Sequence, residues 1–89
     1  MIEQQILASY EAEQAVVGAL IIGGNVDELT TEVNLTPNDF YFSDCKLVYK
    51  CILYLNDKND KIDIVTVDST LKTAKEYNGI EFLKNAISN

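Results

Sequence analysis

Two acidic residues near the start of the chain could in principle form a catalytic pair, because paired carboxylates can act as acid and base. Glu11 and Glu13 lie close together near the start of a predicted helix. Side chains two residues apart on a helix diverge, so these carboxylates are not expected to share a catalytic site. Acidic residues are stabilising at a helix N-terminus, and we interpret both glutamates as serving the dipole of that helix.

The segment "DKNDKID" resembles the start of a calcium-binding loop, but its spacing argues against that function. An EF-hand requires an oxygen ligand at position 5, glycine at position 6 and glutamate at position 12. If the loop began at Asp57, these positions would hold Lys61, Ile62 and Asp68. A lysine among the ligands would repel the cation, so we interpret the segment as a solvated loop between helices.

The two cysteines, Cys45 and Cys51, lie in one predicted helix. Their spacing corresponds to about 9 Å along the helix axis, which prevents a disulfide between them. Without histidine or a third cysteine, no zinc site is expected. The sequence also contains neither a G-x-x-x-x-G-K-[ST] nor a G-x-G-x-x-G loop. We therefore predict two buried, reduced thiols, and a chain that has no cofactor, metal ligand or catalytic residue and is not itself an enzyme.

The charge is distributed unevenly along the chain. Fourteen acidic residues face seven lysines, for a formal net charge of −7, and no base precedes Lys46. Nucleic-acid binding depends on clustered Lys and Arg, so direct contact with nucleic acid is not expected. The apolar run from Ala15 to Ile22 is too short to span a membrane, and no basic residues precede it as in a secretory signal. We expect a cytoplasmic protein that does not bind membranes.

Helical spacing dominates the first half of the chain. Ser9 is a suitable N-cap, and Gly23-Gly24 is expected to end the first helix. That helix should be central and buried, with an apolar stripe that includes Ala12, Ala15, Val16, Ala19 and Leu20. Val17, Ile21 and Ile22 widen this stripe until the C-terminal half is apolar nearly all round. A second helix is predicted over residues 26–33, with Val26, Leu29 and Val33 on one side.

The aromatic segment "TPNDFYFSD" joins this part to the next helix. Thr36-Pro37 predicts a short helical turn, and Ser43 is expected to cap a helix that extends to about Asn56. Phe40 is predicted to fill the core between that helix and the first one. Tyr41 or Phe42 is expected to remain partly exposed.

The second half is expected to contain two more helices. "IDIVTV" has high β propensity, but it also fits a short helix capped by Asp63, which we favour. A last helix should begin near Gly79 and bury Ile80, Phe82, Leu83 and Ile87. The predicted fold is a compact all-α bundle of five or six short helices over residues 9–89, preceded by an N-terminal extension, residues 1–8.

Four segments in order resemble the N-terminal domain of DnaB-type replicative DNA helicases of bacteria and phages. They are "YEAEQAVVGALI", "LTPNDFYFSDCKLVYKCILYL", "IDIVTVDSTL" and "NGIEFLKNAI", which together cover residues 9–87. The family pattern differs in usually having a histidine near Cys45 and a double glycine where Asn78-Gly79 stands.

The resemblance implies a non-catalytic head domain that supports the collar of a helicase hexamer and recruits primase. ATP and magnesium would belong to a separate motor domain, and a helical hairpin would follow the head. The implied partners are the helicase-binding domain of primase, other helicase subunits and a helicase loader. The resemblance also implies partner-binding roles for Glu11, Glu81 and Phe82, although Phe82 also fits a core residue and Glu11 a helix-dipole carboxylate.

Two alternatives remain open. A free-standing acidic domain could act as a regulator that captures primase or a helicase loader. An unrelated all-α domain could also carry similar segments, and substantial β-sheet in the fold would favour that explanation.

Overall fold

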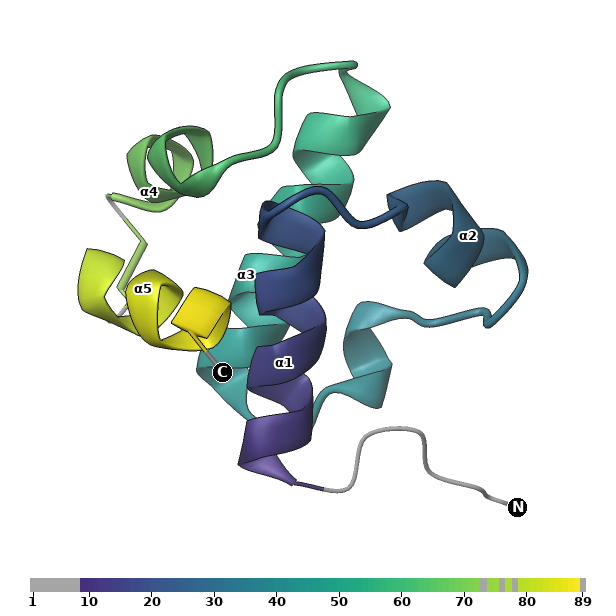
Figure 1. The fold of residues 1–89 in the computed structure, drawn as a ribbon, viewed down its shortest axis with the longest axis horizontal. Helices are drawn as coiled ribbons and strands as arrows, with labels where there is room; N and C mark the ends of the chain where they lie inside the picture. The colour runs from purple at the N-terminus through teal and green to yellow at the C-terminus, as the bar shows by residue number, and fades with distance from the viewer. Residues whose placement is uncertain (1–8, 73, 76, 78, 89) are drawn as a thin grey trace.

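Six helical segments follow one another in the computed structural model, which describes residues 9–72, 74–75, 77 and 79–88. They are α1 (Tyr10–Ile21), α2 (Val26–Thr31), the 3₁₀ turn η1 (Pro37–Asp39), α3 (Ser43–Asp57), α4 (Ile64–Leu71) and α5 (Ile80–Ser88) (Figure 1). The predicted all-α bundle of five or six short helices is confirmed. The extension predicted for residues 1–8 lies outside the described residues.

Helices α1 and α3 lie at the centre of the molecule, with α4 and α5 on one side and α2 with η1 on the other (Figure 1). Seventeen apolar side chains between these helices form one core, which includes Val17, Leu20, Val48, Ile52, Val67 and Leu83. No helix in the described part of the chain is long and apolar enough to cross a membrane.

Helix α1 begins and ends at the predicted residues. The Ser9 hydroxyl accepts a hydrogen bond from the Ala12 N–H at 3.1 Å. At the other end Gly23 has φ +122°, and the Gly24 N–H donates to the Ala19 carbonyl at 2.8 Å. This left-handed turn satisfies a carbonyl that the end of the helix leaves without an intrahelical partner.

The buried face of α1 differs from the prediction. Glu13 and Gln14 are buried together with Val17, Gly18, Leu20 and Ile21, whereas Ala15, Ala19 and Ile22 are exposed. The prediction was therefore confirmed for Val17, Leu20 and Ile21 and wrong for Ala15, Ala19 and Ile22. Helix α5 packs on the Gly18 side of α1, where a Cβ would lie 2.1 Å from the Ala86 carbonyl oxygen. The close approach of α5 at Gly18 decides which face of α1 is buried. The positions of apolar residues in the sequence do not reveal this approach.

Helix α2 is shorter than predicted. It ends at Thr31, and Asn34 then adopts the left-handed conformation with φ +59°. The Leu35 N–H donates to the Leu29 carbonyl at 2.9 Å and so completes the turn. Val33 lies beyond the helix and is 39% exposed, so its predicted place beside Val26 and Leu29 was wrong.

The aromatic segment behaves largely as predicted. The Asp39 carboxylate accepts the Thr36 N–H at 2.7 Å and closes the 3₁₀ turn. Phe40 is 2% exposed, and its ring centroid lies 4.8 Å from that of Tyr49 on α3. Tyr41 is 85% exposed. The turn therefore places one aromatic ring in the core and the next in solvent.

Helix α3 begins one residue earlier than its predicted cap allows. Phe42 occupies the N-cap position and Ser43 is the first helical residue, so the prediction of Ser43 as the cap was wrong. At the other end Asn59 has φ +60°, and the Asp60 N–H donates to the Leu55 carbonyl at 2.9 Å. Both cysteines of this helix are buried and free, as predicted.

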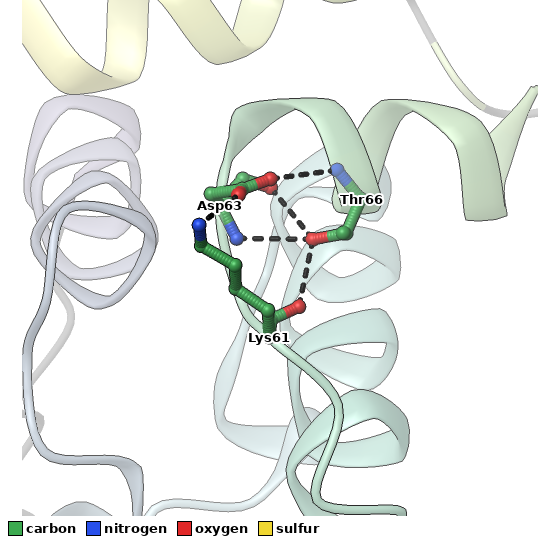
Figure 2. A network of polar contacts seen from close by, with 3 residues as sticks. All are labelled: Lys61, Asp63 and Thr66. Atoms are coloured by element: carbon green, nitrogen blue, oxygen red, sulfur yellow. Dashed lines mark hydrogen bonds and ion pairs between the residues drawn. The ribbon is translucent and has the colours of Figure 1, made fainter.

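The "IDIVTV" segment forms the start of α4, which confirms the helix over the strand. Figure 2 shows the polar contacts that cap it. The Thr66 N–H donates to the Asp63 carboxylate at 2.8 Å, and the Asp63 N–H donates to the Thr66 hydroxyl at 3.0 Å. The Thr66 hydroxyl also donates to the Lys61 carbonyl at 2.8 Å. This reciprocal capping satisfies donors that the helix itself leaves unpaired, and it outweighs the β propensity of the segment.

Candidate partner-binding site

The predicted partner-binding residues lie at the starts of two helices that meet. Glu11 is exposed in the first turn of α1, and Glu81 is exposed in the first turn of α5. Their chain neighbours Tyr10 and Phe82 are in contact, with ring centroids 6.2 Å apart. Glu11 and Glu81 are therefore each adjacent in the chain to one ring of this contact, although they are far apart in the sequence.

Phe82 differs from the two glutamates because it belongs to the core. It is 6% exposed and packs with the other core residues. A partner could touch little of this side chain without a change in the fold. We therefore assign Phe82 to the packing of α5 against the core.

Glu81 has an ionic partner on its own helix. Its carboxylate lies 3.6 Å from the Lys84 ammonium, and both side chains are largely exposed. Exposed ion pairs of this kind contribute at most about 1 kcal/mol. The pair therefore does not prevent the Glu81 carboxylate from binding another cation.

Aromatic rings connect this region to the start of α3. The centroid of Phe42 lies 4.9 Å from that of Tyr10 and 5.1 Å from that of Tyr41, and both pairs meet edge to face. Edge-to-face pairs contribute about 0.5–1.5 kcal/mol beyond the area that they bury. We call Tyr10, Tyr41, Phe42 and Phe82 the aromatic cluster; it joins the starts of α1, α3 and α5.

A buried carboxylate lies beneath this cluster. Glu13 is 1% exposed, and its two oxygens accept hydrogen bonds from the Tyr41 and Phe42 N–H groups at 2.8 and 3.1 Å. Phe42 is the N-cap residue of α3 and has no side-chain cap of its own, so Glu13 supplies the acceptor. The prediction that Glu13 serves the dipole of its own helix missed this contact. Its spacing to Val17 and Leu20, four and seven residues on, is the signal that places it on the buried face.

A second carboxylate fixes Tyr10. The Tyr10 hydroxyl donates to the Asp44 carboxylate at 2.7 Å, and that carboxylate also accepts the Cys45 N–H at 2.7 Å. Burial and the Asp44 carboxylate raise the pKa of Tyr10. Burial raises the pKa of the Cys45 thiol, and the charges of Asp44 and Glu13 add to that shift. Cys45 is therefore a protonated thiol and not an activated nucleophile.

The chemistry of this region is carried by one exposed ring and two exposed carboxylates. Among the described residues, no group of three or more His, Cys, Asp or Glu side chains could hold a metal ion. The exposed features are instead an aromatic side chain, Tyr41, and the carboxylates Glu11 and Glu81. Such a surface can bind a partner through ring contacts and charge.

Comparisons with known proteins identify relatives of this chain. Residues 5–89 match the family described as "DnaB-like helicase N terminal domain". The chain is 40% identical over 76 residues to "Replicative DNA helicase DnaC" of Bacillus subtilis (strain 168), an alignment that covers 82% of this chain and 16% of the relative. It is 35% identical over 72 residues to "Probable replicative DNA helicase" of Trieres chinensis, covering 81% of this chain and 16% of that protein.

A solved structure shows the same fold. The N-terminal domain of DnaB helicase from Mycobacterium tuberculosis superposes with a TM-score of 0.76 at 30% sequence identity, over 90% of this chain and 59% of that one. These matches contradict the alternative of an unrelated all-α domain. The chain spans about one sixth of the length of the curated helicases that it matches. The family match, the sequence identities and the superposition agree, and they show that this chain belongs to the DnaB-like helicase N-terminal domain family.

Proposed function

We propose that this chain is a non-catalytic interaction domain of a replicative DNA helicase. In this role it supports assembly of the hexamer collar and binds the helicase-binding domain of primase during DNA replication. A helicase loader is a further proposed partner. ATP-dependent unwinding would belong to a motor domain elsewhere in the helicase.

One observation carries this proposal. Nearly the whole chain, residues 5–89, matches the helicase N-terminal domain family, while the alignments to replicative helicases cover about one sixth of their length. The surface described above supports it, because Glu11 and Glu81 are exposed at the starts of two helices that are in contact through Tyr10 and Phe82. Tyr41 is exposed at the edge of the aromatic cluster. A domain that presents charge and a ring around a rigid core is suited to binding a protein.

Titration calorimetry with the helicase-binding domain of the cognate primase tests the proposal. We expect binding that is weakened by Glu11→Ala and Glu81→Ala, by about two- to fivefold each because both charges are exposed. Asp57→Ala, which removes an exposed acid at the far end of α3, is the matched control and should leave the affinity unchanged. Absence of binding, both by this chain and by the helicase that contains it, would refute the proposal.

A further inference from the structure

A groove separates α1 from α2 on a face that the aromatic cluster does not occupy. It has a volume of about 360 Å³ and is closed at one end by the turn that joins the two helices. Helix α2 is held to α3 through a hydrogen bond from the Asn56 amide to the Asp27 carboxylate at 3.0 Å. The groove is lined by Ala15, Val16, Ala19, Leu20, Glu28 and Leu29.

The shape of the groove suits a helix. Its α1 side is formed by two pairs of residues that lie one turn apart, so the groove follows the axis of α1. Ala15 and Ala19 are exposed and small, which lets the backbone of another helix approach closely. Val16 and Leu29 are half-buried and form apolar walls. An apolar helix face would remove these side chains from water.

The charge around the groove has one sign. Glu28 is exposed in the groove, Glu32 follows it by one turn of α2, and Glu11 precedes Ala15 by one turn of α1. No lysine or arginine occurs before Lys46 in the sequence, so neither α1 nor α2 contributes a cation. The complementary partner therefore carries positive charge.

We propose that the groove between α1 and α2 binds an amphipathic helix of a partner protein whose apolar face is flanked by Lys or Arg. The proposal rests on the proposed function, because it assigns a surface through which the domain binds a protein. A second copy that met this groove with its own groove would bring the same acidic charge and be repelled. A small polar ligand would need several orienting groups. The groove supplies the charged Glu28 and the polar Asn25, and the Asn25 side-chain oxygen already accepts the Glu28 N–H at 3.1 Å.

The interface would be small, because one helix face meets a single groove. Interfaces below about 1,200 Å² are typical of weak and transient complexes, and exposed charges contribute mainly to the association rate and to salt dependence. We therefore expect weak binding that decreases as the salt concentration rises from about 0.05 to 0.5 M.

Fluorescence anisotropy with a labelled synthetic peptide tests the proposal. The probe is a capped helical peptide of about four turns, with Leu along one face and Lys on the remaining positions. A second peptide carries Glu in place of every Lys. We expect the Lys peptide to bind the wild-type chain and the Glu peptide not to bind.

Three variants with the same net charge locate the binding site. Ala19→Lys fills the groove and places a cation in it, and it should weaken binding by about tenfold or more. Glu28→Gln removes one exposed charge and should weaken binding by about two- to fivefold. Asn85→Lys is the control, because it adds the same charge on the exposed side of α5, and it should leave binding nearly unchanged. Far-UV circular dichroism verifies that each variant is folded.

The outcomes separate this inference from the proposed function. Equal weakening by Ala19→Lys and Asn85→Lys would show diffuse charge attraction and overturn the inference. So would a chain dimer that Ala19→Lys dissociates while leaving peptide binding intact. If primase binds the wild type and Ala19→Lys equally while the peptide does not bind, the groove assignment fails and the proposed function stands. If the peptide binds as expected and primase does not bind, the groove stands and the primase assignment fails.

Discussion

At the scale of single residues, Glu13 connects α1 to the segment that precedes α3. It belongs to α1, it is buried, and its carboxylate receives the two N–H groups that precede α3. A buried carboxylate is tolerated only where hydrogen bonds replace its hydration. Here both oxygens have backbone donors, and the side chain is 1% exposed. The position of Tyr41 on the surface therefore depends on an acidic residue inside.

Substitutions of Glu13 test how much its two hydrogen bonds contribute to the free energy of unfolding. Glu13→Gln keeps the shape but presents an amide NH₂ to one of the two N–H donors, so we expect a loss of about 1–3 kcal/mol in the free energy of unfolding. Glu13→Ala leaves both donors without that partner and should cost more. The matched control is Glu11→Gln, an exposed glutamate in the same turn, which should lose no more than about 1 kcal/mol through the helix dipole. Urea denaturation gives all three values, and equal losses for Glu11→Gln and Glu13→Gln would contradict this role.

At the scale of elements, the crossing of α1 and α5 depends on one glycine. Alanine is favoured over glycine by about 1 kcal/mol inside a helix, so helix propensity alone predicts that Gly18→Ala stabilises α1. A Cβ at this position would lie 2.1 and 2.6 Å from the carbonyl oxygen and carbon of Ala86. These are backbone atoms and cannot rotate away. The steric clash should therefore outweigh the gain in helix propensity.

We expect Gly18→Ala to lower the free energy of unfolding by about 1–3 kcal/mol, as overpacking does, or to separate α5 from α1. Ala19→Gly is the reciprocal control, because Ala19 is exposed in the same helix. It should lose only about 1 kcal/mol through helix propensity. Ala86→Gly should not rescue Gly18→Ala, since the clash is with the backbone. Thermal unfolding checks this order, and a more stable Gly18→Ala would contradict it.

The N-cap of α4 should make the stability of the fold depend on pH, because the side chain that accepts its hydrogen bond, Asp63, is ionisable. The hydrogen bond from the Thr66 backbone N–H holds the pKa of Asp63 below its ordinary value, and the Thr66 hydroxyl and the charge of Lys61 lower this pKa further. A carboxyl whose folded pKa is depressed stabilises the fold above its unfolded pKa. That stabilisation is lost as the pH falls through the folded pKa.

Asp63→Asn retains an N-capping oxygen but cannot titrate. We therefore expect the stability of the wild type to decrease more steeply than that of Asp63→Asn as the pH falls from about 5 to 2. Asp57→Asn, at the C-terminal end of α3, should follow the wild-type curve. The measurement is the unfolding midpoint in urea at each pH. Parallel curves for the wild type and Asp63→Asn would show that this cap does not contribute to acid sensitivity.

At the scale of the whole molecule, local signals predicted the elements better than their contacts. Ser9, Gly23 and Asp63 marked helix ends because caps and left-handed turns depend on residues near in sequence. The contact of Glu13 with Tyr41 and Phe42 spans 28 and 29 residues, and that between Gly18 and Ala86 is longer still. Composition therefore predicted an apolar α1, whereas packing decided which side of it is buried. Of the predicted site, Glu11 and Glu81 lie on the surface and Phe82 lies in the core.

The net charge of −7 affects the molecule as a whole. Excess charge of one sign destabilises a compact state through self-repulsion, while exposed ion pairs such as Lys58–Asp60 and Lys84–Glu81 contribute little. Repulsion should therefore exceed attraction, and the unfolding midpoint should rise as NaCl increases from about 0.02 to 0.3 M. Charge reversals at exposed sites provide the controls. Lys50→Glu, which makes the net charge more negative, should steepen this rise, and Glu32→Lys should flatten it. Thermal unfolding at each salt concentration measures the slopes, and a midpoint that falls with salt would show that the ion pairs dominate.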